Sequence, residues 1–371
     1  MKSSRKLYKY GIFASVGLGI FLIAASASAK VQGQCAECHT MHNSQGGTPM
    51  AYDDNGVLQT GTGTPRDVLL LRGCVSCHTG TNDGTNVIPY VNNADAGGPN
   101  YGTDGIGGAT LAGGNFYWVA TSGAGLDAKG HNVATDSLAG VDGALGMTPP
   151  GFTGTAPTDQ LTCAGTTGCH GDKSATSDFA AISGSHHADD TTIDGTTVAK
   201  SFRFLLGVTG IEDPDWEYTV SSTDHNQYKG IDRTADTDND TSTISSLCAQ
   251  CHDSFHNGSG NVGGANPSGA EFGSPWVRHP TDFDMGNTAL GSEYRSYGGG
   301  TYVPTAPVAS ASVASIVSTV NFADDTIVTC VSCHRAHGTP NDDLLRWDYS
   351  AVQAGVVGGS TGACFSCHTT K

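Results

Sequence analysis

The sequence predicts a chain that is mostly irregular, with short α-helices and little β structure. Gly supplies 52 of the 371 residues and only 37% of the chain is hydrophobic, whereas an average domain has about 7% Gly and about 45–50% apolar residues. A chain of this length would ordinarily form about two domains. Because the apolar side chains are too few to fill two ordinary cores, another source of buried apolar surface is expected.

The cysteines point to that source. All 12 cysteines lie in six motifs, of which five read C-x-x-C-H and one has a longer spacer. Two thiols about one helical turn apart can each bond one vinyl group of a haem, and the adjacent histidine then lies under the iron. Zinc ribbons need no histidine after each cysteine pair. The motifs therefore predict six covalently attached haem c groups, with cysteines Cys35, Cys38, Cys74, Cys77, Cys163, Cys169, Cys248, Cys251, Cys330, Cys333, Cys364 and Cys367, and proximal iron ligands His39, His78, His170, His252, His334 and His368.

Six porphyrins would supply much of the apolar surface that the polypeptide lacks. We therefore expect a multihaem c-type cytochrome in which residues 30–371 form a single hexahaem domain, organised around a continuous haem stack. The longest gaps between motifs contain Gly-rich stretches such as 97–114 and 258–269, which predict loops.

Residues 1–29 read as a secretory signal peptide, with a basic start, an apolar segment at 11–25 and a small-residue cleavage site at 27–29. An apolar segment of about 15 residues is short for a membrane span, so no membrane anchor is expected. Export through the periplasm agrees with covalent haem. After cleavage 14 basic residues remain against 35 acidic ones, a net charge of -21. This acidity makes nucleic acid an improbable partner.

Regular elements are predicted to be brief. The best helical patterns lie at 67–78, 244–256 and 342–349. Short strand candidates lie at 116–120, 202–208 and 315–320, and they are too isolated to predict a sheet.

Eight histidines remain outside the motifs, which exceeds the six needed if every iron has a second imidazole. Methionine is too scarce to replace them, so bis-histidine ligation is expected, with no open coordination site. His225 is the preferred unligated histidine. The candidate distal ligands are His42, His131, His186, His187, His256, His279 and His337.

Three of these candidates follow a proximal histidine closely. His42, His256 and His337 lie three or four residues beyond one, so on a helix each would lie on the same side as that histidine. Such a side chain cannot easily reach round its own haem and must ligate a neighbouring one or none. The pair His186 and His187 could serve one haem, or two if the segment is extended.

Several stretches, in order, resemble the OmcS-type hexahaem cytochromes, which polymerise into extracellular nanowires in metal-reducing bacteria. These stretches are CAECHTMHNS from Cys35, KGHN from Lys129, CAQCHDSFHN from Cys248, RHP from Arg278 and CVSCHRAH from Cys330. The third motif departs from the family because no histidine follows it closely, and the pair at 186–187 would substitute.

The resemblance implies a secreted, cell-surface protein that forms a head-to-tail homopolymer, in which His42 ligates the His334 haem of the next subunit. It also implies electron transfer to other redox cytochromes and extracellular acceptors, without catalysis. Two alternatives stay open. A monomeric electron shuttle would carry the same motifs, and a multihaem reductase would need one haem with an open site.

Overall fold

The computed structural model describes residues 34–42, 44–45, 48–49, 69–70, 73–93, 97–102, 105–120, 127–133, 148–152, 154–155, 157–188, 192–233, 239–256, 279, 281–353 and 363–369. The predicted signal peptide, 1–29, lies outside these residues.

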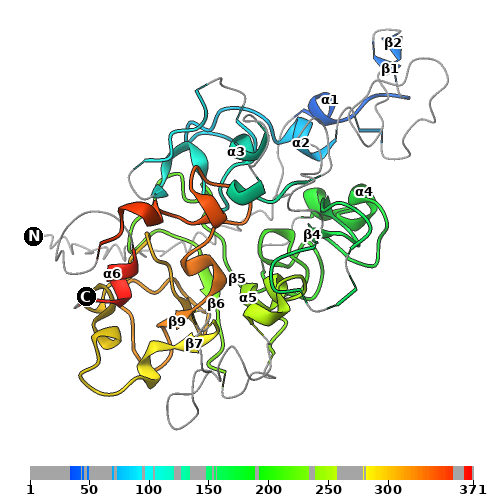
Figure 1. Ribbon diagram of the computed structural model, residues 1–371. Coiled ribbons are helices and arrows are strands. Elements are labelled where there is room, and N and C mark those ends of the chain that lie inside the picture. Colours follow the sequence, from blue (N-terminus) through cyan, green and yellow to red (C-terminus); the bar gives the residue numbers. More distant parts are fainter. Residues whose placement is uncertain are drawn as a thin grey trace, which may run out of the picture.

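Every α-helix of the described chain is one or two turns long (Figure 1). The α-helices are α1 Cys35–Cys38, α2 Cys74–Cys77, α3 Tyr117–Ala120, α4 Asp178–Ala181, α5 Ile244–Ala249 and α6 Cys364–Cys367. Short 3-10 helices lie at Gly108–Thr110, Asp127–Lys129, Ser185–His187, Phe202–Phe204, Asp253–Phe255, Met285–Asn287, Glu293–Gly300, Cys330–Ser332, Asp342–Leu344 and Tyr349–Ala351. None of these helices is long and apolar enough to span a bilayer.

The strands have two or three residues each and form three small sheets. Strands β1 Ser44–Gln45 and β2 Thr48–Pro49 pair antiparallel, and β3 Thr162–Ala164 pairs parallel with β4 Gly168–His170. A five-stranded sheet has the order β5-β6-β8-β9-β7, with strands β5 Gly210–Ile211, β6 Gln227–Lys229, β7 Phe283–Asp284, β8 Ala309–Ser310 and β9 Ile327–Val328.

This architecture confirms the predicted fold class of mostly irregular chain with short helices and little β structure. The predicted strand positions were wrong. The 116–120 stretch contains helix α3, the 202–208 stretch begins with a 3-10 helix, and the 315–320 stretch forms only one isolated bridge, at Thr319. The strands of the five-stranded sheet could not be predicted, because segments of two or three residues are too short to show a periodic pattern.

The predicted helices are present in shortened form. Helix α5 begins at Ile244, where the Thr243 side chain caps it by accepting the N–H of Ser246 at 3.1 Å. In the 67–78 stretch only α2 is helical among the described residues. The 342–349 stretch holds one 3-10 helix, Asp342–Leu344, and ends where another begins, at Tyr349.

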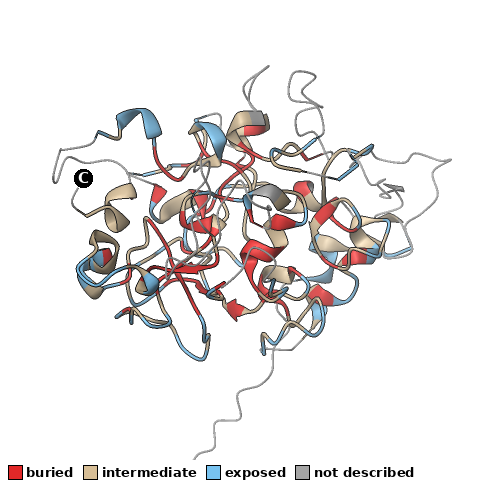
Figure 2. Ribbon diagram, turned by 60° about the horizontal axis from the view of Figure 1, so that its bottom comes forward, coloured by how far each residue is buried: buried red, intermediate tan, exposed pale blue. Residues whose placement is uncertain are grey.

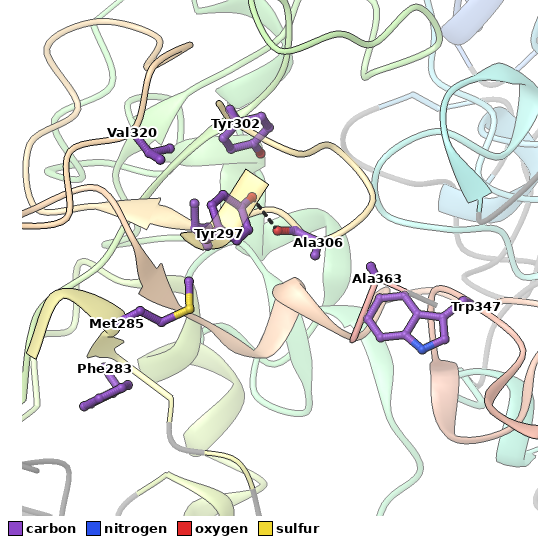
Figure 3. Packing of buried hydrophobic residues seen from close by; sticks show 9 residues of the cluster. Phe283, Met285, Tyr297, Tyr302, Ala306, Val320, Trp347 and Ala363 are labelled. Atoms are coloured by element: carbon purple, nitrogen blue, oxygen red, sulfur yellow. Dashed lines mark hydrogen bonds between the residues drawn. The ribbon is translucent and has the colours of Figure 1, made fainter. Parts of the chain in front are cut away.

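Two hydrophobic clusters lie within the body of the molecule. One contains Phe202, Leu205, Val208, Tyr228, Ile244, Ala309, Ile327 and Val331. The other, shown in Figure 3, contains Phe283, Met285, Tyr297, Tyr302, Ala306, Val308, Val320, Trp347 and Ala363. Motif cysteines pack at the edge of both clusters: Cys169 beside the first and Cys333, Cys364 and Cys367 beside the second. The buried segments gather at the centre, and much of the remaining chain is only partly covered (Figure 2).

Candidate functional site

The local structure of the regular motifs places their cysteines one turn apart. Helices α1, α2 and α6 each begin and end on the two cysteines of a motif. The fifth motif lies on the 3-10 helix Cys330–Ser332, and the fourth begins within α5 at Cys248. In each of these motifs the N–H of the histidine bonds to the carbonyl of the first cysteine, at 2.8 to 3.0 Å. The two cysteines of each motif therefore lie one turn apart along the backbone, the arrangement that haem attachment requires.

The third motif brings its cysteines together by a different route. Cys163 lies on β3 and Cys169 on β4, and these parallel strands pair Thr162 with Gly168 and Ala164 with His170. The turn between them uses Gly165 at a φ of +81°, a conformation that glycine adopts without strain. Adjacent strands thus replace the helical turn that a longer spacer cannot form.

One cavity joins all six motifs. Its volume is about 2970 Å³, which is roughly three to ten times that of a typical small-molecule pocket. All 12 cysteines line it, together with the histidines His39, His78, His131, His170, His186, His187, His252, His279, His334, His337 and His368.

Ten of these histidines face one another in pairs across the cavity. In every pair one member is the histidine of a motif and the other lies outside the motifs. The ring centres are 5.8 Å apart for His39 and His187, 6.4 Å for His78 and His186, 6.3 Å for His170 and His337, 6.1 Å for His252 and His131, and 6.1 Å for His368 and His279. Two ring nitrogens that share a metal, each at about 2 Å, place their ring centres about 6 Å apart. The paired residues therefore fit a metal bound between two imidazoles.

Hydrogen bonds at Nδ1 orient several of these rings. Each bond joins Nδ1 to a backbone carbonyl: His78 to Pro89 at 2.8 Å, His131 to Ala336 at 2.5 Å, His170 to Arg203 at 2.9 Å, His252 to Pro150 at 2.8 Å and His334 to Asp343 at 2.7 Å. A carbonyl only accepts, so Nδ1 must carry the proton. Nε2 is then left as the nitrogen free to bind a metal.

Burial favours the neutral, metal-binding form of seven of the cavity imidazoles by lowering their pKa values. It lowers the pKa of His186 to about 4 and the pKa of His337 to about 3, and nearby histidines act in the same direction. Burial also lowers the pKa values of His78, His131, His170, His279 and His334.

His334 differs from the other cavity histidines because no imidazole faces it among the described residues. Nδ1 of His334 is held by the backbone carbonyl of Asp343 at 2.7 Å. His42 is exposed and does not line the cavity. The hairpin β1–β2, which follows His42, projects from the body on the side away from α6 (Figure 1).

Two other histidines lie outside the cavity. His256, which the sequence offered as a distal ligand, is 1% exposed, and its Nε2 lies 2.9 Å from Oδ2 of Asp282. This position differs from the expected one, since the nitrogen that would bind iron faces a carboxylate. His225 stacks on Tyr302, with ring centres 3.5 Å apart and an angle of 5° between the planes.

The adjacent histidines His186 and His187 face two different motifs. They lie on the 3-10 helix Ser185–His187, not on an extended segment as one of the sequence alternatives required. Successive residues of a 3-10 helix are about 120° apart around its axis, so the two rings can diverge towards His78 and His39. No sequence pattern indicated this turn.

Asp213 is a buried carboxyl at the edge of the cavity, with 1% of its surface exposed. Its Oδ1 accepts the backbone N–H groups of Asp215 and Glu217, at 3.0 and 2.9 Å. Burial, and after it the neighbouring Asp215 carboxyl, raises the pKa of Asp213 to about 7. The folded protein therefore holds this proton more tightly than the unfolded chain does.

We expect the folded protein to lose stability as the pH rises through about 7, and Asp213→Asn to remove part of that loss. An unfolded Asp has a pKa of about 3.9, so the contribution is fully present below that pH and disappears as the folded group ionises. The amide of the variant cannot ionise. Denaturant unfolding of both proteins at about pH 5 and about pH 8 measures the effect. The same pH dependence in both would contradict this role of Asp213.

The family model of the doubled CXXCH motif matches residues 322–371. No curated protein matches the chain. A structure of the outer membrane cytochrome S filament from Geobacter sulfurreducens is 20% identical and has a TM-score of 0.46, covering 93% of this chain and 100% of that one. A structure of the OmcS nanowires from the same organism is also 20% identical, with a TM-score of 0.49 and coverage of 92% and 100%.

The stretch that matches the doubled CXXCH model contains the two final motifs, Cys330–His334 and Cys364–His368. These motifs have the helical turn, the apolar packing and the shared cavity described above. Residues 322–371 thus carry a doubled C-x-x-C-H motif, the covalent attachment signature of c-type haem.

Proposed function

We propose that this chain is a secreted hexahaem c-type cytochrome that carries electrons and polymerises head to tail through His42. One observation supports the proposal most strongly. Among the described residues, the cavity histidines form five facing pairs and leave His334 unpaired, while His42 is exposed and does not line the cavity. One copy of the chain therefore lacks one ligand and offers one.

The segments that follow His39 and His334 make the same backbone contacts, and this repeat indicates what His42 does. The N–H of Thr40, next to His39, bonds to the Leu69 carbonyl at 2.7 Å, as the N–H of Arg335, next to His334, bonds to the Leu344 carbonyl at 2.9 Å. Isolated bridges also correspond, because His39 pairs with Leu70 as His334 pairs with Leu345.

Within the second repeat, the histidine three residues beyond the motif faces a different motif: His337 lies opposite His170. His42 occupies the same place in the first repeat, three residues beyond His39. By the same geometry it should face the histidine of another motif. Among the motif histidines of the described chain, only His334 lacks a facing imidazole, so the ligand pair is completed between two copies. A contact that repeats head to tail without closing produces a fibre.

Each bound haem would supply a site that accepts and releases one electron. The chain contributes the thiols that fix the six haems, the imidazole pairs that exclude other axial ligands, and the single cavity that keeps neighbouring groups close. Bis-histidine ligation leaves no position for a substrate. These features favour an electron carrier over an enzyme, with other redox proteins or extracellular acceptors as partners.

Two other functions remain distinguishable by simple measurements. A monomeric shuttle would show no filaments in negative-stain electron microscopy. A reductase would have an open iron that binds carbon monoxide after reduction.

We expect the intact mass of the purified protein to equal that of the chain plus six haems. The third motif decides the count, because a disulfide between Cys163 and Cys169 would use the two thiols of that motif and only five haems could attach. Replacing both of these cysteines with Ser should remove one haem and leave the other five attached. A wild-type mass with five haems and two fewer hydrogens would show that the third motif holds a disulfide.

A further inference from the structure

The same backbone arrangement holds two of the proximal histidines. At the fifth motif, Nδ1 of His334 bonds to the carbonyl of Asp343 at 2.7 Å, and the next N–H, that of Arg335, bonds to the carbonyl of Leu344 at 2.9 Å. Asp343 and Leu344 have φ angles of 58° and 56°. The backbone of both accepting residues therefore lies in the left-handed region.

The third motif repeats this arrangement with unrelated residues. Nδ1 of His170 bonds to the carbonyl of Arg203 at 2.9 Å, and the N–H of Gly171 bonds to the carbonyl of Phe204 at 2.8 Å. The φ angles of Arg203 and Phe204 are 51° and 60°. We call each of these residue pairs, 203–204 and 343–344, a left-handed clamp.

Part of a third clamp is visible at the first motif. Leu69 has a φ of 55°, and its carbonyl accepts the N–H of Thr40, the residue after His39. Its preceding residue lies outside the described part of the chain.

The recurrence does not follow from the structure of the motifs. The fifth motif is a 3-10 helix, whereas the third lies on two parallel strands. Left-handed residues that carry a Cβ are uncommon and strained, and two in succession are rarer still. Such strain persists where the surrounding structure enforces it, often at functional sites. The shared feature is the pair of carbonyls directed at a proximal histidine and its following peptide.

We propose that the left-handed clamps are positioning elements, which set the orientation and basicity of the proximal imidazoles of His170 and His334. The inference rests on the proposed haem function of those histidines. A carbonyl on Nδ1 fixes the tautomer and makes Nε2 a stronger donor. A stronger donor favours the oxidised iron, so each clamp lowers the reduction potential of its haem.

Asp343 is the position that separates backbone conformation from side-chain chemistry. Its residue is exposed. Asn tolerates the left-handed region well, whereas a β-branched residue such as Val strongly disfavours it. Asp343→Asn and Asp343→Val both remove the charge, so they differ chiefly in whether the clamp can form.

The test measures the haem potentials of both variants by spectroelectrochemistry, on the full protein with six attached haems. Asp343→Val should raise the reduction potential of one haem. Asp343→Asn should change the potentials only through the loss of the carboxylate charge, an effect that both variants share. Asp343→Ala is a milder variant that should shift the same haem in the same direction if the Val variant does not fold. Val and Ala variants with the potentials of the Asn variant would overturn the proposal.

A second readout identifies the affected haem. In a His42→Ala background the His334 iron would be five-coordinate, and its iron–histidine stretching band in resonance Raman spectra reports the hydrogen bond at Nδ1. Asp343→Val should lower that frequency, and Asp343→Asn should not. If His42→Ala yields no five-coordinate haem, the interchain ligation is wrong, but the potentials measured with His42 intact still decide whether the clamp acts.

Discussion

His42→Ala should abolish or greatly shorten filaments while leaving six haems attached to a soluble protein. The variant removes the exposed imidazole that we propose completes the pair with His334 of the next copy. One haem should then become high-spin and bind carbon monoxide after reduction, whereas the wild type binds none. Negative-stain microscopy, the electron paramagnetic resonance spectrum and carbon monoxide titration measure these three results.

Met41→Ala is the matched control, because Met41 adjoins His42 and is 74% exposed. It should keep all irons low-spin, since it changes the same surface without removing a ligand. Added imidazole should return the His42→Ala iron to the low-spin state but should not restore filaments, because free imidazole does not connect two chains. Normal filaments with every haem low-spin in His42→Ala would exclude the proposed ligation between subunits.

Arg335→Ala should cost about 3–5 kcal/mol of folding free energy, because it leaves several buried carbonyls without their donor and each such group costs about 1–3 kcal/mol. Arg335 is 3% exposed and donates to the carbonyls of Gly105, Leu111 and Ala112, the last at 2.9 Å. Burial lowers its pKa to about 10, so it is still charged at neutral pH. Truncation would leave three carbonyls without this donor in a site that little water reaches.

The loss should disturb two of the proposed haem sites, because Arg335 lies between His334 and His337 in the sequence. Arg335→Lys should recover part of the stability, since an ammonium keeps the charge but cannot span carbonyls as a planar guanidinium does. Lys200→Ala is a control on the surface: Lys200 lies 3.7 Å from Asp194 in a partly exposed pair, for which about 0–1 kcal/mol is expected. Denaturant unfolding ranks the variants. An Arg335→Ala protein as stable as the Lys200→Ala protein would contradict a structural role for Arg335.

The sequence predicted the parts of the site that depend on short-range spacing. A C-x-x-C-H motif fixes its two sulfurs and one imidazole within a single turn, so the motif residues could be recognised without knowledge of the fold. The third motif was recognisable by composition, but the parallel pairing of β3 and β4 that closes its spacer depends on contacts that no local pattern encodes.

The pairing of the histidines could not be predicted, because each pair joins distant parts of the chain. His256 is an example. Its position four residues beyond His252 suggested a ligand, yet its side chain contacts Asp282. The sequence around His256 contains no pattern that predicts this contact. The strand predicted at 202–208 failed for a related reason. Its aromatic residues favour a strand, but Arg203 and Phe204 adopt left-handed conformations and face the third motif.

The cavity that joins all six motifs has a consequence for how the molecule is made. Beside its two hydrophobic clusters, this chain encloses about 2970 Å³ lined by all 12 motif cysteines. If these cysteines carry haem as we propose, haem attachment and folding should be coupled. We expect each motif to acquire a haem as soon as it emerges, whereas the histidine that faces it lies far away in the sequence, as with His39 and His187. Contacts between such distant residues form late. Newly made chains should therefore pass through a stage with attached haems and provisional ligands, and the native partners would have to displace those ligands before the chain becomes compact.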